Sequence, residues 1–221
     1  MNLKELPLFK SINQEGYRFI GIFLGISLVL QLFGLSLLAK LFFFLALFSG
    51  YFFRDPERYA PLLENSVASP ADGKVILVDQ LEESEVYGKK PCIKISIFMS
   101  LFNVHVNRIP ISGKVVEMRY HPGKFFSANL DKASAENERQ EIVIETSWKS
   151  KVAFVQIAGL IARRIVCHLE TNDRVIKGAR FGLIRFGSRL DVYLPVETIV
   201  NVHPGQHVKA GETVLGYLHY D

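Results

Sequence analysis

The chain has 221 residues, of which 49% are hydrophobic, and its 26 Lys and Arg against 22 Asp and Glu give a formal net charge of +4. This length suits one domain of ordinary size with an appendage, and the apolar content excludes a disordered or fibrous protein. Two cysteines, Cys92 and Cys167, are too few for a disulfide scaffold and lack metal-site spacing. The mild positive charge forms no basic stripe, which argues against a nucleic-acid-binding protein.

The apolar residues are concentrated near the N-terminus. Residues 19–39 are uncharged and numerous enough to cross a bilayer as a helix, whereas the second run, 41–53, is short for a full crossing. We therefore predict a cytoplasmic segment at 1–18 and a membrane anchor at 19–53. The anchor is either a helical hairpin with Lys40 at its far turn, or one span followed by a helix lying in the interface.

Basic residues flank both ends of the predicted anchor, and the positive-inside tendency then favours the hairpin with both ends in the cytoplasm. A core helix of a soluble protein fits these lengths less well. A cleaved signal peptide is also disfavoured, because the run is too long and no small-residue cleavage site follows it.

From residue 54 onward, short stretches alternate apolar and polar residues. Ile93, Ile95 and Ile97 alternate with polar neighbours, and residues 142–144, 152–157 and 190–194 also have the character of strands. This pattern predicts strands with one wet face. A weak helix candidate covers about 127–138. We predict a mostly β (α+β) domain at 54–221, with two half-sandwich or barrel-like motifs at 67–77 and 203–217.

Common cofactor motifs are missing from the sequence. It contains neither a G-x-x-x-x-G-K-[ST] loop nor a strand-linked G-x-G-x-x-G, which argues against nucleotide use. H-E-x-x-H is also missing. His203 and His207 are four residues apart, but Pro204 and Gly205 between them prevent a shared helical face, so exposed turn residues are a better interpretation than a metal pair.

The Gly187-Ser188 step lies between two apolar-alternating stretches. Glycine leaves its own carbonyl sterically open, and the next serine hydroxyl can turn back onto it. With a nearby base, the peptide bond can shift to an ester, which eliminates and leaves a pyruvoyl group at the new chain start. Gly-Ser is also common in ordinary turns, so the dipeptide alone does not distinguish the two interpretations.

Such a reaction needs a base and a group that orients it. Histidine is the natural base near neutral pH, and a carboxylate can hold its tautomer, as in serine-hydrolase triads. His105 lies in an apolar stretch just after the alternation at 93–97, and Asp72 lies in the turn Ser69-Pro-Ala-Asp-Gly73. A packed core histidine and an ordinary Asp-Gly turn are the alternatives, and sequence alone does not show that these residues meet.

Six motifs in the same order resemble those of phosphatidylserine decarboxylases in their short bacterial and archaeal form. They cover nearly the whole chain, at residues 53–58, 69–73, 103–108 with 123–126, 136–139, 156–159 with 162–165, and 181–189. The resemblance implies that Asp72, His105 and Ser188 form a self-processing triad. It also implies cleavage between Gly187 and Ser188 into a chain of residues 1–187 and a chain of residues 188–221, which stay associated.

Two positions depart from the long bacterial form of this family. Arg189 follows Gly187-Ser188, where the long form has Leu-Gly-Ser-Thr. Phe102 stands where the long form has a second histidine, three residues before the base. Any role of that histidine in decarboxylation then has to be filled otherwise, for instance by His105 alone.

The resemblance implies a carboxy-lyase whose cofactor is a covalent pyruvoyl group derived from Ser188, with no metal and no pyridoxal phosphate. Phosphatidylserine would form a Schiff base with it, lose CO₂, take a proton from His105 and leave as phosphatidylethanolamine. The expected location is the inner membrane, with the catalytic domain on the cytoplasmic side, and a homodimer is left open. Candidate contacts for headgroups or substrate, with plain topology-setting or surface charge as the alternative, are Arg54, Arg58, Arg163 and Arg164.

A second class of protein also fits part of the chain. Residues 203–216 resemble a lipoyl- or biotinyl-type hairpin, which occurs in membrane-anchored adaptors of export systems. This alternative predicts an intact, non-enzymatic chain. Two observations oppose it: the sequence has no long heptad stretch for an adaptor coiled coil, and Lys209 lacks flanking methionines.

Overall fold

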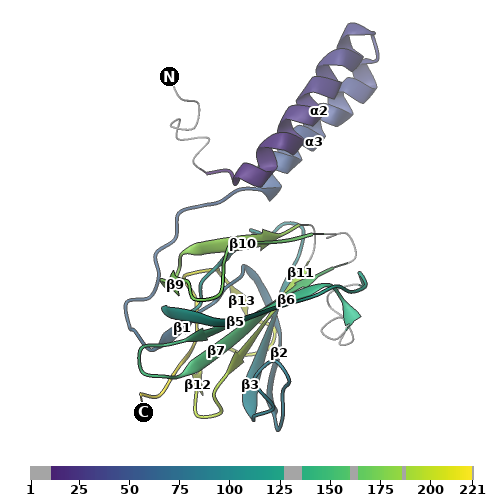
Figure 1. The fold of residues 1–221 in the computed structure, drawn as a ribbon. Coiled ribbons are helices and arrows are strands. Elements are labelled where there is room, and N and C mark those ends of the chain that lie inside the picture. Colours follow the sequence, from purple (N-terminus) through teal and green to yellow (C-terminus); the bar gives the residue numbers. More distant parts are fainter. Residues whose placement is uncertain (1–10, 127–135, 160–163, 186–187, 221) are drawn as a thin grey trace. The chain divides into compact units, whose positions relative to one another are not determined.

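The computed structural model describes residues 11–126, 136–159, 164–185 and 188–220. The chain divides into two compact units, Met1–Glu57 and Arg58–Asp221. Among the described elements, helices α2 and α3 belong to the first unit and strands β1 to β14 to the second (Figure 1).

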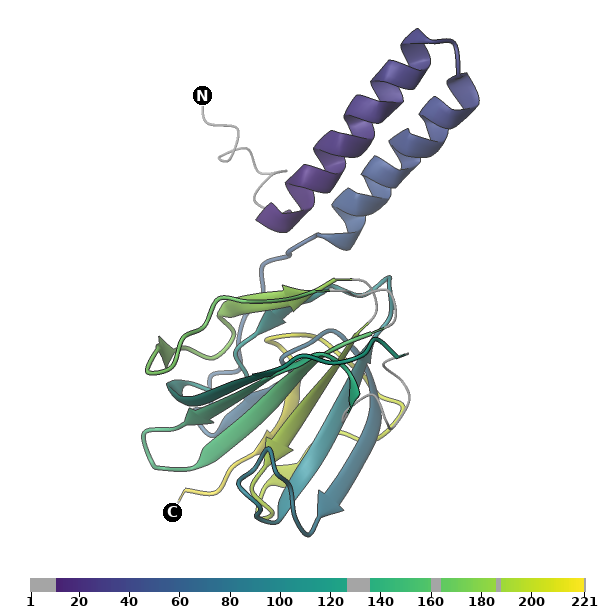
Figure 2. The same cartoon turned by 45° about the vertical axis from the view of Figure 1, so that its right-hand side comes forward.

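The first unit contains two antiparallel helices that lie side by side (Figures 1 and 2). Helix α2 spans Gln14–Leu32 and begins at Asn13, whose side chain accepts a hydrogen bond from the Glu15 amide. Helix α3 spans Ser36–Phe52. Gly34 between them has φ +75°, the left-handed conformation that glycine tolerates best. The Asn13 amide donates to the Phe53 carbonyl at 2.8 Å, so the pair begins and ends at the same place.

The helices expose apolar side chains on most of their surface. Helix α2 buries Gly16 alone among its residues, and Leu32, Phe33 and Leu37 near the turn are about four-fifths exposed. Within the described part of the chain, α2 is the one helix long and apolar enough to cross a membrane, and α3 is shorter. A helix pair that is apolar all round requires apolar surroundings beyond itself.

The second unit is built on an eight-stranded antiparallel sheet, hereafter the large sheet, which curls as seen in Figure 2. Its order is β13-β2-β3-β11-β7-β6-β5-β9. The strands are β2 (Gly73–Leu81), β3 (Cys92–Met99), β5 (Gly113–His121), β6 (Arg139–Glu145), β7 (Lys151–Ala158), β9 (Arg174–Val175), β11 (Ser188–Leu194) and β13 (His207–Val208).

Two three-stranded sheets complete the unit, with orders β1-β14-β12 and β4-β10-β8. The mostly β prediction is confirmed. The two predicted half-sandwich motifs pair with one another: Val67 pairs with Gly216, and Lys74 pairs with His207. The strands are β1 (Ser66–Ala68), β4 (Val106–Arg108), β8 (Ile165–Cys167), β10 (Arg180–Ile184), β12 (Ile199–Val200) and β14 (Val214–Tyr217).

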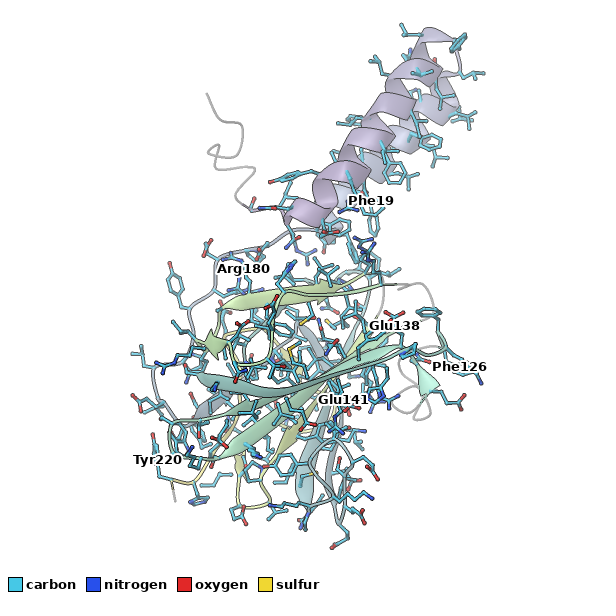
Figure 3. The ribbon with its side chains drawn as sticks, in the orientation of Figure 1. Phe19, Phe126, Glu138, Glu141, Arg180 and Tyr220 are labelled. Carbon is cyan, nitrogen blue, oxygen red and sulfur yellow. The ribbon has the colours of Figure 1, made fainter. Side chains whose placement is uncertain are left out.

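The main core lies on one face of the large sheet, hereafter the inner face. It contains the alternating apolar residues of the central strands, among them Ile95, Phe154 and Val192. Side chains fill the space between the sheets (Figure 3). The predicted strands at 93–97, 142–144, 152–157 and 190–194 are all present, whereas the helix candidate at 127–138 falls mostly outside the described residues.

The prediction of a wet face is wrong for β11, where all seven residues are buried. It is also wrong for the predicted stretches 142–144 and 152–157, whose residues are all buried. β11 pairs with β3 on one side and β7 on the other. A second apolar cluster, which includes Val155 and Tyr193 with Tyr87 packed against it, covers the outer face of the sheet. A central strand covered on both faces keeps its alternating pattern but loses its contact with water.

Candidate active site

The first residue of β11, Ser188, lies where three strand ends meet. It pairs with Met99, the last residue of β3, and with Ala158, the last residue of β7. We call this end of the large sheet the site end. Phe126 and Glu138 lie toward it, and Tyr220 lies at the opposite end (Figure 3).

The register brings the segments that carry Asp72 and His105 to the same end. β2 begins directly after Asp72, and its second residue, Lys74, pairs with Phe98 of β3. His105 lies in the connection from β3 to β4. All three residues of the predicted triad therefore belong to segments that start or finish at the site end.

Ser188 is fully buried. Its Oγ lies 3.8 Å from Met99 Sδ, and the same sulfur lies 3.7 Å from Asn107 Nδ2. The Oδ1 of Asn107 in turn accepts a hydrogen bond of 2.9 Å from Gln156 Nε2. A thioether sulfur is a weak acceptor, so this contact ties the serine hydroxyl only loosely.

His105 is 2% exposed, and its Nδ1 lies 3.0 Å from the Asn103 carbonyl oxygen. A carbonyl oxygen can only accept, so Nδ1 carries the proton of this hydrogen bond. In the neutral ring the basic lone pair is then on Nε2. The local backbone thus selects the tautomer that a general base needs.

His105 directly precedes β4 (Val106–Arg108). Asn107 within β4 contacts the Met99 sulfur, which also contacts Ser188 Oγ. Val106 pairs with Leu183 of β10, so the segment of His105 enters the sheet beside the end of β10 at Ile184. From Ile184 the chain continues through Gly187 to Ser188.

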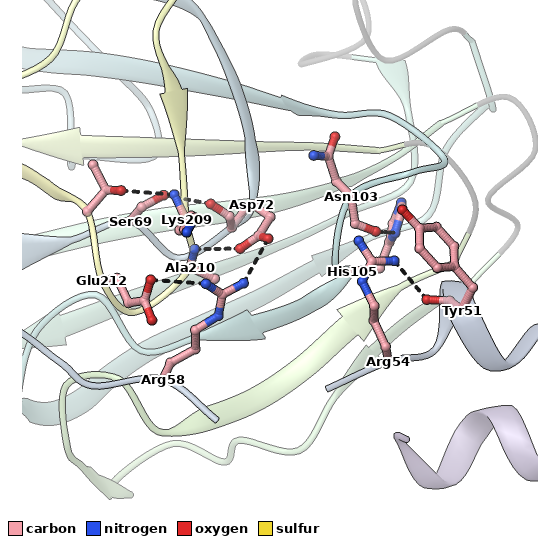
Figure 4. A network of polar contacts seen from close by, with 12 residues as sticks. Tyr51, Arg54, Arg58, Ser69, Asp72, Asn103, His105, Lys209, Ala210 and Glu212 are labelled. Atoms are coloured by element: carbon pink, nitrogen blue, oxygen red, sulfur yellow. Dashed lines mark hydrogen bonds and ion pairs between the residues drawn. The ribbon is translucent and has the colours of Figure 1, made fainter. Parts of the chain in front are cut away.

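Asp72 belongs to a group of three charged side chains and one backbone amide. We call this group the Arg58 clamp, and its members are Arg58, Asp72, Glu212 and the amide of Ala210. The Oδ1 of Asp72 accepts from the Ala210 amide at 2.7 Å, and Oδ2 lies 3.1 Å from Arg58 Nη2. The Nη1 of Arg58 lies 3.0 Å from Glu212 Oε2. Figure 4 shows the clamp on one side and the His105–Asn103 contact on the other.

Gly73 allows the turn that holds Asp72 to pass close to β3. A Cβ atom at this position would collide with the Phe98 carbonyl oxygen. The turn is also tied to the segment after His105, because the Arg108 amide donates to the Pro70 carbonyl at 2.9 Å. The turn and the histidine segment are thus held together through their backbones.

The described contacts of the Asp72 carboxylate go to Arg58 and Ala210, and that of His105 Nδ1 goes to Asn103. The orienting role of Asp72 toward His105 therefore stays a prediction. Arg58, predicted as a headgroup contact, uses both of its terminal nitrogens on carboxylates inside the domain. A headgroup would have to compete with those carboxylates.

The remaining predicted residues are spread over both units. In the first unit, Arg54 donates to the Tyr51 carbonyl and lies 3.9 Å above its ring centroid. In the second, Arg164 is exposed beside β8, and its carbonyl accepts from the Arg185 amide. Gly187 and Arg163 lie outside the described residues. The described part of the chain contains no cluster of three or more His, Cys, Asp or Glu side chains suited to a metal ion.

Sequence analysis did not identify Met99, Asn107, Gln156 or Glu212 as neighbours of the candidate residues. Asn107 carried a signal, because it belongs to the same short motif as His105, two residues later. Gln156 and Glu212 carried none, since their partners lie far away in the sequence.

Comparisons with known proteins place the chain in a family. The family model for phosphatidylserine decarboxylase matches residues 45–216. A phosphatidylserine decarboxylase proenzyme of Citrifermentans bemidjiense is 53% identical over 94% of this chain and 96% of its own length. The proenzyme of Syntrophus aciditrophicus is 52% identical over 93% of this chain and 96% of its own length. The proenzyme of Rickettsia typhi is 47% identical over 94% of this chain and 90% of its own length. The chain belongs to the phosphatidylserine decarboxylase family.

Proposed function

We propose that this chain is a proenzyme that cuts itself between Gly187 and Ser188 and then decarboxylates phosphatidylserine to phosphatidylethanolamine and CO₂. The observation that carries the proposal is the register of the large sheet. It brings the segments of Asp72, His105 and Ser188 to one end, with Ser188 at the first position of a central strand. Family membership supplies the substrate class.

In the proposed self-cleavage, Ser188 Oγ attacks the Gly187 carbonyl carbon, and the peptide bond becomes an ester as the nitrogen leaves. Removal of the Ser188 α-proton then breaks the Cβ–Oγ bond, which releases Gly187 as a carboxylate. The dehydroalanine left at 188 takes up water and loses ammonia to become a pyruvoyl group. Nε2 of His105 is the proposed base, because its Nδ1 proton is held by Asn103.

The residues around Ser188 fit a pyruvoyl group at this position. The site is buried and its described contact is a weak acceptor, so a small neutral group replaces the serine side chain without losing a strong hydrogen bond. When formed, the pyruvoyl ketone supplies an electron sink for decarboxylation of a bound amine. His105 then holds the proton for the carbon that has lost CO₂, and Arg163 and Arg164 are proposed to bind the acidic groups of the substrate.

The helices α2 and α3 are proposed to insert in the membrane as a hairpin, with the catalytic domain on the cytoplasmic side. Support comes from their exposed apolar side chains and from the meeting of their ends at Asn13 and Phe53. A diacyl lipid leaves a bilayer at a cost of about 0.8 kcal/mol for each CH₂, so an enzyme anchored at the surface avoids extracting it. Arg54 is proposed to contact anionic headgroups there.

The two proposed cleavage products are expected to stay together without a covalent bond. In the segment after residue 187, β11 pairs with β3 and β7, β13 pairs with β2, and β14 pairs with β1. The Arg58 clamp adds two further contacts between the proposed chains. Asp72 and Arg58 belong to the chain 1–187, and their partners Ala210 and Glu212 belong to the chain 188–221. The pairing of residues 203–217 within this domain and the family membership give no support to the export-adaptor alternative.

The mass of the denatured protein, recorded with and without borohydride, tests the proposal. We expect two chains, 1–187 and 188–221, with a reducible carbonyl in place of an amino terminus on the second. Borohydride in the presence of vesicles containing phosphatidylserine should attach the lipid amine to that second chain. The variant Ser188→Ala is the control and should remain one chain.

Each result decides one part of the proposal. A wild-type protein that releases CO₂ from phosphatidylserine while remaining a single chain would contradict self-cleavage. A cleaved, carbonyl-bearing protein that decarboxylates a soluble amino acid but not the phospholipid would contradict the substrate and retain the chemistry.

A further inference from the structure

The residue directly after the proposed nucleophile is a buried arginine that the proposed chemistry does not use. Arg189 is 2% exposed. It pairs with Phe98 and Ile157, whereas Ser188 pairs with Met99 and Ala158. Because successive side chains of a strand point to opposite faces, Arg189 lies on the outer face of the large sheet and Ser188 on the inner face.

Two groups hold the Arg189 guanidinium, Asp191 on β11 itself and Ser96 on the neighbouring strand β3. Its Nε donates to Asp191 Oδ1 at 2.6 Å, and its Nη2 donates to Ser96 Oγ at 2.7 Å. Asp191 is fully buried and also lies 3.1 Å from Lys94 Nζ. Three charged side chains and one hydroxyl therefore join β11 to β3 on the face opposite to Ser188.

This network is specific to one register of the two strands. Ser96 pairs directly with Asp191, so Arg189 reaches it diagonally across the strands. A slip of one residue would turn Arg189 and Asp191 toward the apolar inner face. Buried ion pairs are weak evidence for stability, but the fixing of register is one of their best attested uses.

The proposed self-cleavage creates a need for such a device. It turns residue 188 from an internal residue into the first residue of a chain, and chain ends fray unless they are tied down. On the inner face, the described side-chain contact of residue 188 is the weak one to Met99. A reacting group has to be held within about 0.5 Å of its productive position, so another part of the strand has to supply the restraint.

We propose that Arg189 is a positioning residue that holds residue 188 in register between Met99 and Ala158, both before the bond to Gly187 breaks and afterwards. This inference rests on the proposed function, since it concerns the residue at which the chain would be cut. Arg189 acts through the backbone of β11 and does not touch the reacting atoms.

The test compares two variants that weaken the network with one that weakens the same strand elsewhere. Ser96→Ala removes one of the two acceptors, and Arg189→Lys keeps the charge but loses the two-point fork. Leu194→Ala is the matched control, because Leu194 is a buried core residue at the other end of β11. For each protein we would measure the melting temperature, hydrogen exchange in the peptide that starts at residue 188, and kcat and KM per carbonyl-bearing chain.

We expect exchange at residues 189–191 to rise about tenfold or more in Ser96→Ala and Arg189→Lys, because the strand start opens locally. We also expect kcat to fall about 10- to 100-fold with little change in KM, as for a misplaced reacting group. Leu194→Ala should melt at an equal or lower temperature and yet keep near wild-type exchange at 189–191 and near wild-type kcat. Network variants that match Leu194→Ala in both quantities would overturn the proposal.

Making the same variants in a Ser188→Ala chain, which is expected to remain uncleaved, tests the role of Arg189 separately from the proposed function. In that uncleaved chain, Ser96→Ala should still raise exchange at 189–191 relative to Leu194→Ala if Arg189 fixes the register. A wild-type protein without a carbonyl would contradict the proposed function and leave this exchange comparison intact. Equal exchange in the two uncleaved variants would contradict the anchoring role even if the wild type is cleaved and active.

Discussion

The two halves of the candidate site differ in the kind of interaction that builds them. Around Ser188 the described contacts are neutral: a thioether, the Asn107 amide and the Gln156 amide. Around Asp72 they are charged: the Arg58 guanidinium, the Glu212 carboxylate and a backbone amide. The described contact of the Ser188 hydroxyl is to a weak acceptor, whereas the Asp72 carboxylate contacts a guanidinium and a backbone amide.

This difference indicates a division of tasks. A serine that is to attack a neighbouring carbonyl is hindered by strong hydrogen bonds, because they have to be broken first. The clamp, in contrast, connects the turn before β2 to residues of the C-terminal segment, which would become a separate chain. We infer that the Ser188 half performs chemistry and that the Asp72 half has at least a holding role. The predictions below test this division.

The largest effect is expected from removing the proposed base of the Ser188 half. His105→Ala should slow self-cleavage about 10²- to 10⁴-fold, the usual contribution of a positioned general base. The rate is measured as the fraction of cleaved chain with time after synthesis. The matched control is His121→Ala, since His121 contacts Glu141 on β6 and belongs to neither half of the site. An equal loss in both variants would show that the effect is structural.

The next effect distinguishes a chemical from a holding role for Asp72. Asp72→Asn and Glu212→Gln each remove one carboxylate from Arg58 while keeping the shape of the side chain. If Asp72 also orients His105, Asp72→Asn should slow cleavage at least about tenfold more than Glu212→Gln at comparable melting temperatures. Similar cleavage rates in the two variants would assign Asp72 to the clamp alone.

A smaller effect is expected on the neutral network itself. Gln156→Leu leaves the buried Asn107 carbonyl oxygen without the donor that it has in the structure, and should lower the free energy of unfolding by about 1–3 kcal/mol. The double variant Asn107→Leu/Gln156→Leu should recover part of this loss, because both polar partners are gone. Urea unfolding of the uncleaved Ser188→Ala protein gives these values. If the double variant loses more free energy of unfolding than the two single variants together, a simple pairing of Asn107 with Gln156 is contradicted.

The smallest effect concerns pH and the outer face of the large sheet, at the end of β11 opposite to Ser188. Burial, followed by the nearby Asp191 charge, raises the pKa of Tyr193, and burial also raises that of Tyr87. A raised pKa means that folding favours the neutral phenol. This contribution to stability is complete below about pH 10, the unfolded pKa, and is lost as the pH rises toward the folded pKa. Ultraviolet titration should show both tyrosines ionising only after the exposed ones, and Tyr193→Phe should remove one late transition.

Local sequence patterns predicted the strands well and the partners of the site residues poorly. The alternation at 93–97 and 190–194 located two central strands, because period-two burial is a local property. The same alternation wrongly predicted a wet face for β11, since the cluster over its outer face comes from other parts of the chain, Tyr87 among them. A strand carries no local signal for what covers it.

The candidate site shows the same limit. Ser188 and His105 were identified because their chemistry is visible in short motifs. The partners of Asp72 were missed, because Ala210 and Glu212 approach it from a distant segment. Arg189 was noted as a departure from the long form of the family, but its burial beside Asp191 depends on the register with β3, which no short motif specifies.

The central position of β11 in the large sheet constrains the order of synthesis, sheet assembly and cleavage. β3 and β7 are made first, and each exposes an unpaired edge until β11 has been synthesised and inserted between them. The large sheet therefore closes only when synthesis is almost complete, and a cut at residue 187 before that point would release the missing strand. The peptide bond between residues 187 and 188 is thus needed while the sheet assembles. On the proposed function, it is cleaved after assembly. From then on, refolding requires two molecules to meet, so the persistence of the mature protein is governed by how slowly it unfolds.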